Sequence, residues 1–196
     1  MSVVVPAATL AAVIRFVRPF TGEVVHRQLP VQNPAGLWAP TSRARRWNRG
    51  FSALYTSLLL DVAFAERIKR SLARPASLVV GVARASIARV LDFQNKDVQR
   101  LLGFAAGALT TEDYALTQRF GAALFEANVT GLLVPAAIAS TATRYPSFRL
   151  TREGHSETRV TPHAGTNLVI FTDNLHRGDG YPESHRVRCE LTGIPA

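Results

Sequence analysis

Residues 45–66 read RRWNRGFSALYTSLLLDVAFAE, and this stretch decides how the rest of the chain is interpreted. It opens as an arginine-rich turn, continues as a predicted strand over residues 52–56, and becomes an apolar run with helical spacing. Ser57 precedes that run and is a candidate helix N-cap. Glu66 falls inside the run, where a carboxylate costs free energy unless a partner compensates it. We therefore expect Glu66 to meet a polar partner or a ligand.

The composition predicts one folded domain, spanning residues 1–196. Hydrophobic residues make up 47% of the chain and charged residues 19%, which is ordinary for a globular domain with a sizeable core. The net charge of +9 comes almost wholly from arginine, since the only lysines are Lys69 and Lys96. A compositional bias toward arginine across a genome explains this excess as well as selection for phosphate binding does. The charge alone therefore identifies no function.

The cysteine and histidine content and the N-terminal residues argue against disulfide-bonded, zinc-binding and membrane-spanning proteins. The single cysteine, Cys189, excludes an internal disulfide and a cysteine-based zinc site. The histidines are scattered without a carboxylate at metal-ligand spacing. The opening MSVVVPAATLAAVI is apolar, but it lacks a basic leading region and is too short to span a bilayer. We expect a cytoplasmic protein with no membrane span and no metal site.

Hydrophobic patterns predict the remaining elements. Helices are predicted over residues 7–18, 57–72, 95–102 and 110–126, the last with a capping box at its start. Strands are predicted over residues 23–29, 77–83, 90–93, 131–134, 167–171 and 187–191. Residues 30–49 are too rich in proline and glycine for regular structure, and residues 141–166 are expected to form a long surface loop.

Four predicted segments each contribute one polar side chain that a ligand can use, namely Arg27, Arg46, Tyr55 and Glu66. Separate elements that contribute one such residue each build a cleft, but they also build an ordinary surface. Glu66 can instead pair with Arg70 one helical turn on. Spacing alone leaves both interpretations open.

The order of several short motifs resembles the RES domain family. These motifs are HR at 26–27, RWN at 46–48, LYTS at 54–57, AxxE at 63–66, LD at 91–92, DY…TQ…G across 113–121, GLLVP at 131–135 and NLVIF at 167–171. The resemblance covers most of residues 22–171, and residues 141–166 look like an insertion relative to the family. It implies an α+β fold similar to that of ADP-ribosyltransferases, with a split β-sheet core and peripheral helices.

The resemblance also implies a function. Most RES proteins resemble bacterial toxins that destroy NAD+ and are encoded beside an Xre-type helix-turn-helix antitoxin that buries the active site. On this basis we expect cleavage of the bond between nicotinamide and ribose, with water or inorganic phosphate as the acceptor. NAD+ is then the substrate, no cofactor is required, and the antitoxin is the expected partner in a hetero-oligomer.

The family is named for an arginine, a glutamate and a serine, and the first two match Arg27 and Glu66. The serine position is occupied by Ala136, within PAA at 135–137. This departure removes a hydroxyl that the resemblance would place against a phosphate or a ribose. Three explanations stay open: a neighbour such as Ser140 or a water takes over that role, activity is reduced, or the substitution was introduced to reduce the toxicity of the protein.

The resemblance suggests a role for each remaining candidate. Glu66 would stabilise the positive charge that develops on the ribose when nicotinamide leaves. Arg27 and Arg46 would hold the pyrophosphate through charge-assisted hydrogen bonds. Tyr55 would stack on or clamp the nicotinamide. Further candidates for hydrogen bonds to the substrate are Asn48 and Asn167.

Two alternatives stay open. Transfer of ADP-ribose onto a macromolecule uses the same site and differs only in the acceptor. A nucleic-acid-binding module is the other class, motivated by the net charge and by the arginine run at 43–49 around Trp47. The basic residues are spread over the whole chain and no recognised nucleic-acid motif is present, so we expect no direct nucleic-acid binding.

Overall fold

The computed structural model describes residues 5–30, 38–59, 62–63, 66, 77–104, 107–111, 113–137, 147–152, 155–160, 165–176, 179 and 184–191. The helices are α1 (Ala7–Ile14), α3 (Lys96–Leu102) and α4 (Ala115–Glu126), with a 3-10 turn η3 (Thr172–Asn174). The strands are β1 (Arg18–Pro30), β2 (Ala53–Ser57), β3 (Ser77–Asp92), β4 (Gly131–Pro135), β5 (Ser147–Arg152), β6 (His155–Val160), β7 (Thr166–Phe171) and β8 (Ser184–Leu191).

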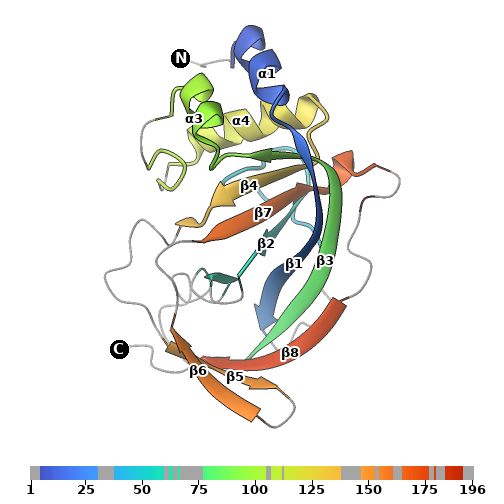
Figure 1. Ribbon diagram of the computed structural model, residues 1–196, viewed down its shortest axis with the longest axis vertical. Helices are drawn as coiled ribbons and strands as arrows, with labels where there is room; N and C mark the ends of the chain where they lie inside the picture. The colour runs from blue at the N-terminus through green and yellow to red at the C-terminus, as the bar shows by residue number, and fades with distance from the viewer. Residues whose placement is uncertain are drawn as a thin grey trace.

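The sheet is organised around the long strand β3, which runs beside β1 through both halves of the molecule (Figure 1). On its other edge β3 pairs with β8 over residues 77–83 and with β4 over residues 90–92. The sheet therefore divides into one half that contains β4, β7 and β2 and another that contains β8, β5 and β6. With helices at one end of this divided sheet, the predicted α+β class is confirmed (Figure 1).

Side chains supply backbone partners where the sheet divides. Between the two partner strands of β3, the N–H of Ala88 donates to the Asp179 carboxylate at 2.7 Å and the N–H of Arg89 donates to the Thr130 hydroxyl at 3.2 Å. These side chains give both N–H groups a partner at positions outside the pairings of β3 with β8 and β4. The division is therefore stabilised by specific polar contacts.

Two apolar clusters lie on opposite faces of the half that contains β4, β7 and β2. The first packs between this half and the helices, and its largest buried side chains include Trp47, Phe93 and Phe171. The second lies on the other face and includes Leu168 and Ile170. Because side chains alternate along a strand, β7 presents Asn167, Val169 and Phe171 toward the helical face. This register decides where Asn167 lies.

Several predicted elements are confirmed, with shifted ends. Helix α3 begins at Lys96, because the side chain of Asn95 accepts the N–H groups of Asp97 and Val98 as a helix cap. Strands β2, β4 and β7 lie within one residue of their predicted bounds. Helix α4 ends at Glu126 as predicted.

Other predictions need correction. The predicted helix over residues 7–18 ends at Ile14 because β1 begins at Arg18, and the predicted strands 77–83 and 90–93 are two parts of β3. Residues 141–166 do not form one long loop, since β5 and β6 pair along their whole length within it. The expected capping box at residue 110 is also wrong, because α4 begins at Ala115, whose N–H donates to the Asp113 carboxylate.

Candidate active site

Glu66 lies beside the paired ends of β2 and β7. Ser57, the last residue of β2, is directly opposite Asn167 of β7. The Ser57 hydroxyl donates to Asn167 Oδ1 at 2.6 Å, and Asn167 Nδ2 donates to Glu66 Oε1 at 3.3 Å. The polar partner that the sequence demanded for Glu66 is therefore Asn167. The cap that the sequence predicts at Ser57 stays a prediction, because most of the helix expected after it, including Leu60, lies outside the described residues.

The side chain of Val62, which precedes Glu66 in the same segment, packs directly against Gly165, the residue before β7. A Cβ on Gly165 would lie 2.1 Å from Val62 Cγ2, so only glycine lets the two segments approach this closely. The carbonyl of Gly165 also accepts the N–H of Ala136 at 2.9 Å. Val62 and Ala136 are both fully buried. The Glu66 segment, the start of β7 and the end of β4 therefore meet at Gly165.

Ala136, which occupies the family's serine position, sits behind this meeting point. Its relative exposure is 0%, so its methyl group is sealed from solvent in this structure. It follows β4, in which Val134 lies opposite Asn167. A side chain at position 136 is therefore close in the fold to the residue that contacts Glu66. Ser140, the candidate replacement, lies outside the described residues.

The backbone places Arg27 near the same end of β2. Strand β1 pairs with β2 through His26 and Ser57, and Arg27 is the next residue along β1, opposite Gly81 of β3. The two residues that the family motif matches, Arg27 and Glu66, therefore belong to segments that flank Ser57. The pairing of β1 with β2 places the backbone of Arg27 one residue along from the position opposite Ser57.

Tyr55 and the buried Asn48 form a hydrogen-bond pair that shapes the loop before β2. The Tyr55 hydroxyl donates to Asn48 Oδ1 at 2.8 Å and accepts the N–H of Trp47 at 3.0 Å. Asn48 Nδ2 contacts the carbonyls of Thr41, Arg43 and Phe51 at 2.9–3.2 Å.

The environment of Asn48 changes its predicted role. Its relative exposure is 0%, and both polar atoms of its side chain are engaged by protein groups. A side chain with no exposed surface does not contact a ligand in this conformation. Asn48 therefore folds the loop, and the expected hydrogen bond to substrate is not supported by its geometry.

Arg46 connects the same loop to the turn that precedes α4. Its Nη1 donates to the carbonyl of Leu109 at 3.2 Å and to the carbonyl of Thr111. Its guanidinium carbon lies 4.5 Å from the centre of the Tyr114 ring, within the range of a cation–π contact. Three groups thus hold the guanidinium at the edge of the helical layer. To bind pyrophosphate, the guanidinium of Arg46 must give up some of these three contacts.

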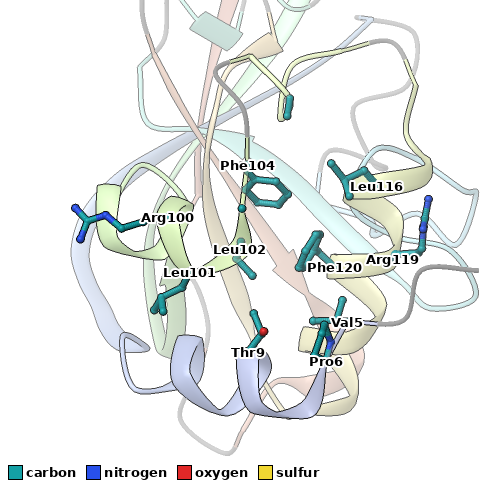
Figure 2. Close-up of a pocket in the computed structure, with 12 residues that line it drawn as sticks. Val5, Pro6, Thr9, Arg100, Leu101, Leu102, Phe104, Leu116, Arg119 and Phe120 are labelled. Carbon is teal, nitrogen blue, oxygen red and sulfur yellow. The ribbon is translucent and has the colours of Figure 1, made fainter.

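A separate cavity of about 510 Å³ lies within the helical layer. Figure 2 shows Leu116 and Phe120 of α4 facing Phe104 across it, with Arg100 and Arg119 at its edges. The lining is mainly apolar, and Glu66, Asn167 and Ser57 take no part in it. We place the candidate active site at the carboxylate, since an apolar cavity supplies no group for bond cleavage.

The residues that sequence reasoning missed are Ser57, as a partner of Asn167, and Gly165. Both are defined by contacts between segments that are far apart in the chain. Within the described residues, no group of three histidine, cysteine, aspartate or glutamate side chains is arranged to hold a metal ion. In the same part of the chain, no helix has the length and apolar character needed to cross a membrane.

Comparisons with known proteins point to one family. The family described as the RES domain matches residues 24–191. A solved structure, that of the M. tuberculosis MbcT–MbcA toxin–antitoxin complex, contains a chain with a similar fold at a TM-score of 0.59 and 16% identity. The similarity covers 91% of this chain and 90% of that chain. A search of curated proteins finds no match.

Proposed function

This chain belongs to the RES domain family, and from that premise we propose that it is a toxin that degrades NAD+ by cleaving the bond between nicotinamide and ribose. The observation that carries the proposal is the Glu66 carboxylate, held by Asn167 at the paired ends of β2 and β7. A carboxylate positioned by a neutral amide keeps its negative charge available for a cationic reaction centre. Glycosidic bond cleavage requires a group of this kind.

The chemistry needs charge stabilisation more than proton transfer. Nicotinamide in NAD+ is already cationic, so it departs as a neutral molecule with the bonding electron pair. The ribose carbon is left with oxocarbenium character, which a nearby carboxylate stabilises electrostatically. Glu66 is assigned that role. Water or phosphate then adds to the same carbon.

The other residues of the proposal bind and orient the substrate. Arg27 and Arg46 are assigned to the pyrophosphate, where guanidinium groups form paired, charge-assisted hydrogen bonds. Tyr55 contributes its ring to the nicotinamide end, because its hydroxyl is already held by Trp47 and Asn48. Asn167 is assigned to position Glu66, because its side-chain amide donates a hydrogen bond to the carboxylate.

We also propose an inhibitory protein partner. The fold match is to a chain from a toxin–antitoxin complex, and a cell that loses NAD+ cannot grow, so an active form needs an inhibitor. An Xre-type helix-turn-helix antitoxin that covers Glu66 is the expected partner. Expression of the wild-type chain alone should arrest bacterial growth, whereas expression of Glu66→Gln should not.

The direct test is NAD+ consumption by the purified protein, measured with and without inorganic phosphate. Loss of NAD+ with release of nicotinamide supports the proposal, and the Arg27→Ala variant should lose most of the activity. Mass spectrometry of the second product identifies the acceptor as water, phosphate or a macromolecule. Wild-type protein that leaves NAD+ intact would refute the proposed reaction.

Restoring the family's hydroxyl is expected to raise activity. Ala136→Ser places an Oγ at a fully buried position close to the Asn167–Glu66 pair, so the hydroxyl acts on the reaction through this pair. One added hydrogen bond that orients a charged group contributes enough to raise kcat/KM by roughly tenfold. Steady-state kinetics on NAD+ check the result. Ala137→Ser is the matched control, since it adds the same hydroxyl one residue along and should leave kcat/KM unchanged. Equal rates for Ala136→Ser and wild type would show that the hydroxyl has no role here.

A further inference from the structure

Ser57 is buried at the end of β2, with a relative exposure of 6%. Its hydroxyl oxygen lies 2.6 Å from Asn167 Oδ1, a distance typical of a well-formed O–H···O hydrogen bond. The amide of Asn167 in turn reaches Glu66. These contacts form one chain from Ser57 through Asn167 to the carboxylate.

The chemistry of the three groups sets the direction of this chain. The ionised carboxylate of Glu66 only accepts hydrogen bonds, so the Asn167 amide must present Nδ2 to it. Its Oδ1 then faces Ser57 and needs a donor, which the hydroxyl provides. Without that donor, Oδ1 would lose the partner that fixes its direction. The amide would then be free to rotate away from the carboxylate.

We propose that Ser57 is a positioning residue, which acts through the Asn167 amide to hold Glu66 in its reactive orientation. This inference rests on the proposed function for its catalytic consequence. The orientation of the Asn167 amide by Ser57 does not depend on which substrate the site binds.

The hydroxyl is not needed to hold the strands together. The ladder between β2 and β7 runs from Ala53 opposite Phe171 to Ser57 opposite Asn167. Beyond it, the N–H of Leu58 donates to the carbonyl of Thr166 at 2.9 Å. Loss of the Ser57 hydroxyl should therefore leave the backbone in place and affect the amide alone.

The kinetic experiment compares Ser57→Ala, Asn167→Ala and the double variant with wild type on NAD+. Ser57→Ala should lower kcat roughly fivefold to tenfold, the effect of one lost hydrogen bond, with a much smaller change in KM. In the Asn167→Ala background, Ser57→Ala should have no further effect, because the intermediary is gone. Equal loss in both backgrounds would overturn the inference.

Thr56→Val is the matched control. Thr56 is the neighbouring residue of β2, its hydroxyl donates to the carbonyl of Leu168 at 3.0 Å, and strand alternation directs it to the opposite face. Removing that hydroxyl should leave kcat on NAD+ unchanged. A loss of kcat equal to that of Ser57→Ala would assign the effect to strand packing and overturn the inference.

A second readout needs no turnover. The side-chain amide signals of Asn167 in a 15N-labelled sample, assigned by their absence in Asn167→Ala, should shift in Ser57→Ala and keep their positions in Thr56→Val. Unchanged signals in Ser57→Ala would overturn the inference even if kcat falls. Shifted signals in a protein that leaves NAD+ intact would support the positioning role and refute only the proposed reaction.

Discussion

Replacement of Glu66 by glutamine is expected to lower the rate of NAD+ consumption by roughly a hundredfold or more, the scale seen when one group that stabilises transition-state charge is removed. Glutamine is nearly isosteric with glutamate, and its carbonyl oxygen can still accept the hydrogen bond from Asn167 Nδ2. The substitution therefore removes the negative charge while keeping the geometry. Release of nicotinamide from NAD+ is the measurement.

Glu126→Gln is the control for the change in net charge. Glu126 is the last residue of α4, and its side chain is exposed. This variant changes the net charge by the same amount as Glu66→Gln but should keep the wild-type rate. If Glu66→Gln also keeps the wild-type rate, the carboxylate is not part of the reaction and the site assignment fails.

The substitution Gly121→Ala is expected to destabilise the fold by about 2 kcal/mol or more. In an exposed helix this change would stabilise by about 1 kcal/mol, because alanine has the higher helix propensity. Here a Cβ would lie 2.0 Å from the carbonyl oxygen of Trp47 and 2.9 Å from its carbonyl carbon. A backbone carbonyl cannot rotate away as a side chain can, so either the loop or α4 must move.

Thermal unfolding measures this effect, with an expected fall in Tm of about 4–8 °C for a domain of this size. Ala123→Gly, in the same helix, measures the effect of helix propensity alone and should lower the free energy of unfolding by about 1 kcal/mol. The Gly121 variant should also lose NAD+ turnover, because Trp47 holds the hydroxyl of Tyr55. A variant at Gly121 that is more stable than wild type would show that the close approach is absent in solution.

Local patterns predicted the elements whose signals lie within one short window. The apolar runs GLLV and NLVIF became β4 and β7, and the helix predicted over residues 95–102 became α3, with Asn95 as its cap. The division of the sheet was not accessible in this way. Strand β3 was read as two short strands because its middle, RASIAR at 84–89, lacks a long apolar run. Pairing with β1 keeps it extended across that region.

The hairpin of β5 and β6 was missed for the same reason. Its residues are polar and carry several charges, so their pattern resembles that of a loop. In the fold, β5 pairs with both β6 and β8. These backbone hydrogen bonds depend on strands that the window around β5 does not contain, and propensity is a weak guide where pairing decides the conformation.

For the site, the sequence by itself selected the side chain to which we assign the chemistry. A carboxylate in an apolar run required a partner, and the ordered motifs matched Arg27 and Glu66 to the family's functional pair. It also placed Asn167 and Asn48 together as candidate ligand contacts. Only the tertiary structure separated them, because Asn48 is sealed inside the loop whereas Asn167 reaches Glu66.

The tertiary structure alone decided that Ser57 belongs to this site. Ser57 and Asn167 are 110 residues apart, and they meet because β2 and β7 pair in a register that sets them directly opposite each other. A shift of one residue would send one of the two side chains to the other face of the sheet. Residue type and spacing specify which groups are available, but strand register, which is set by the whole core, specifies which of them touch.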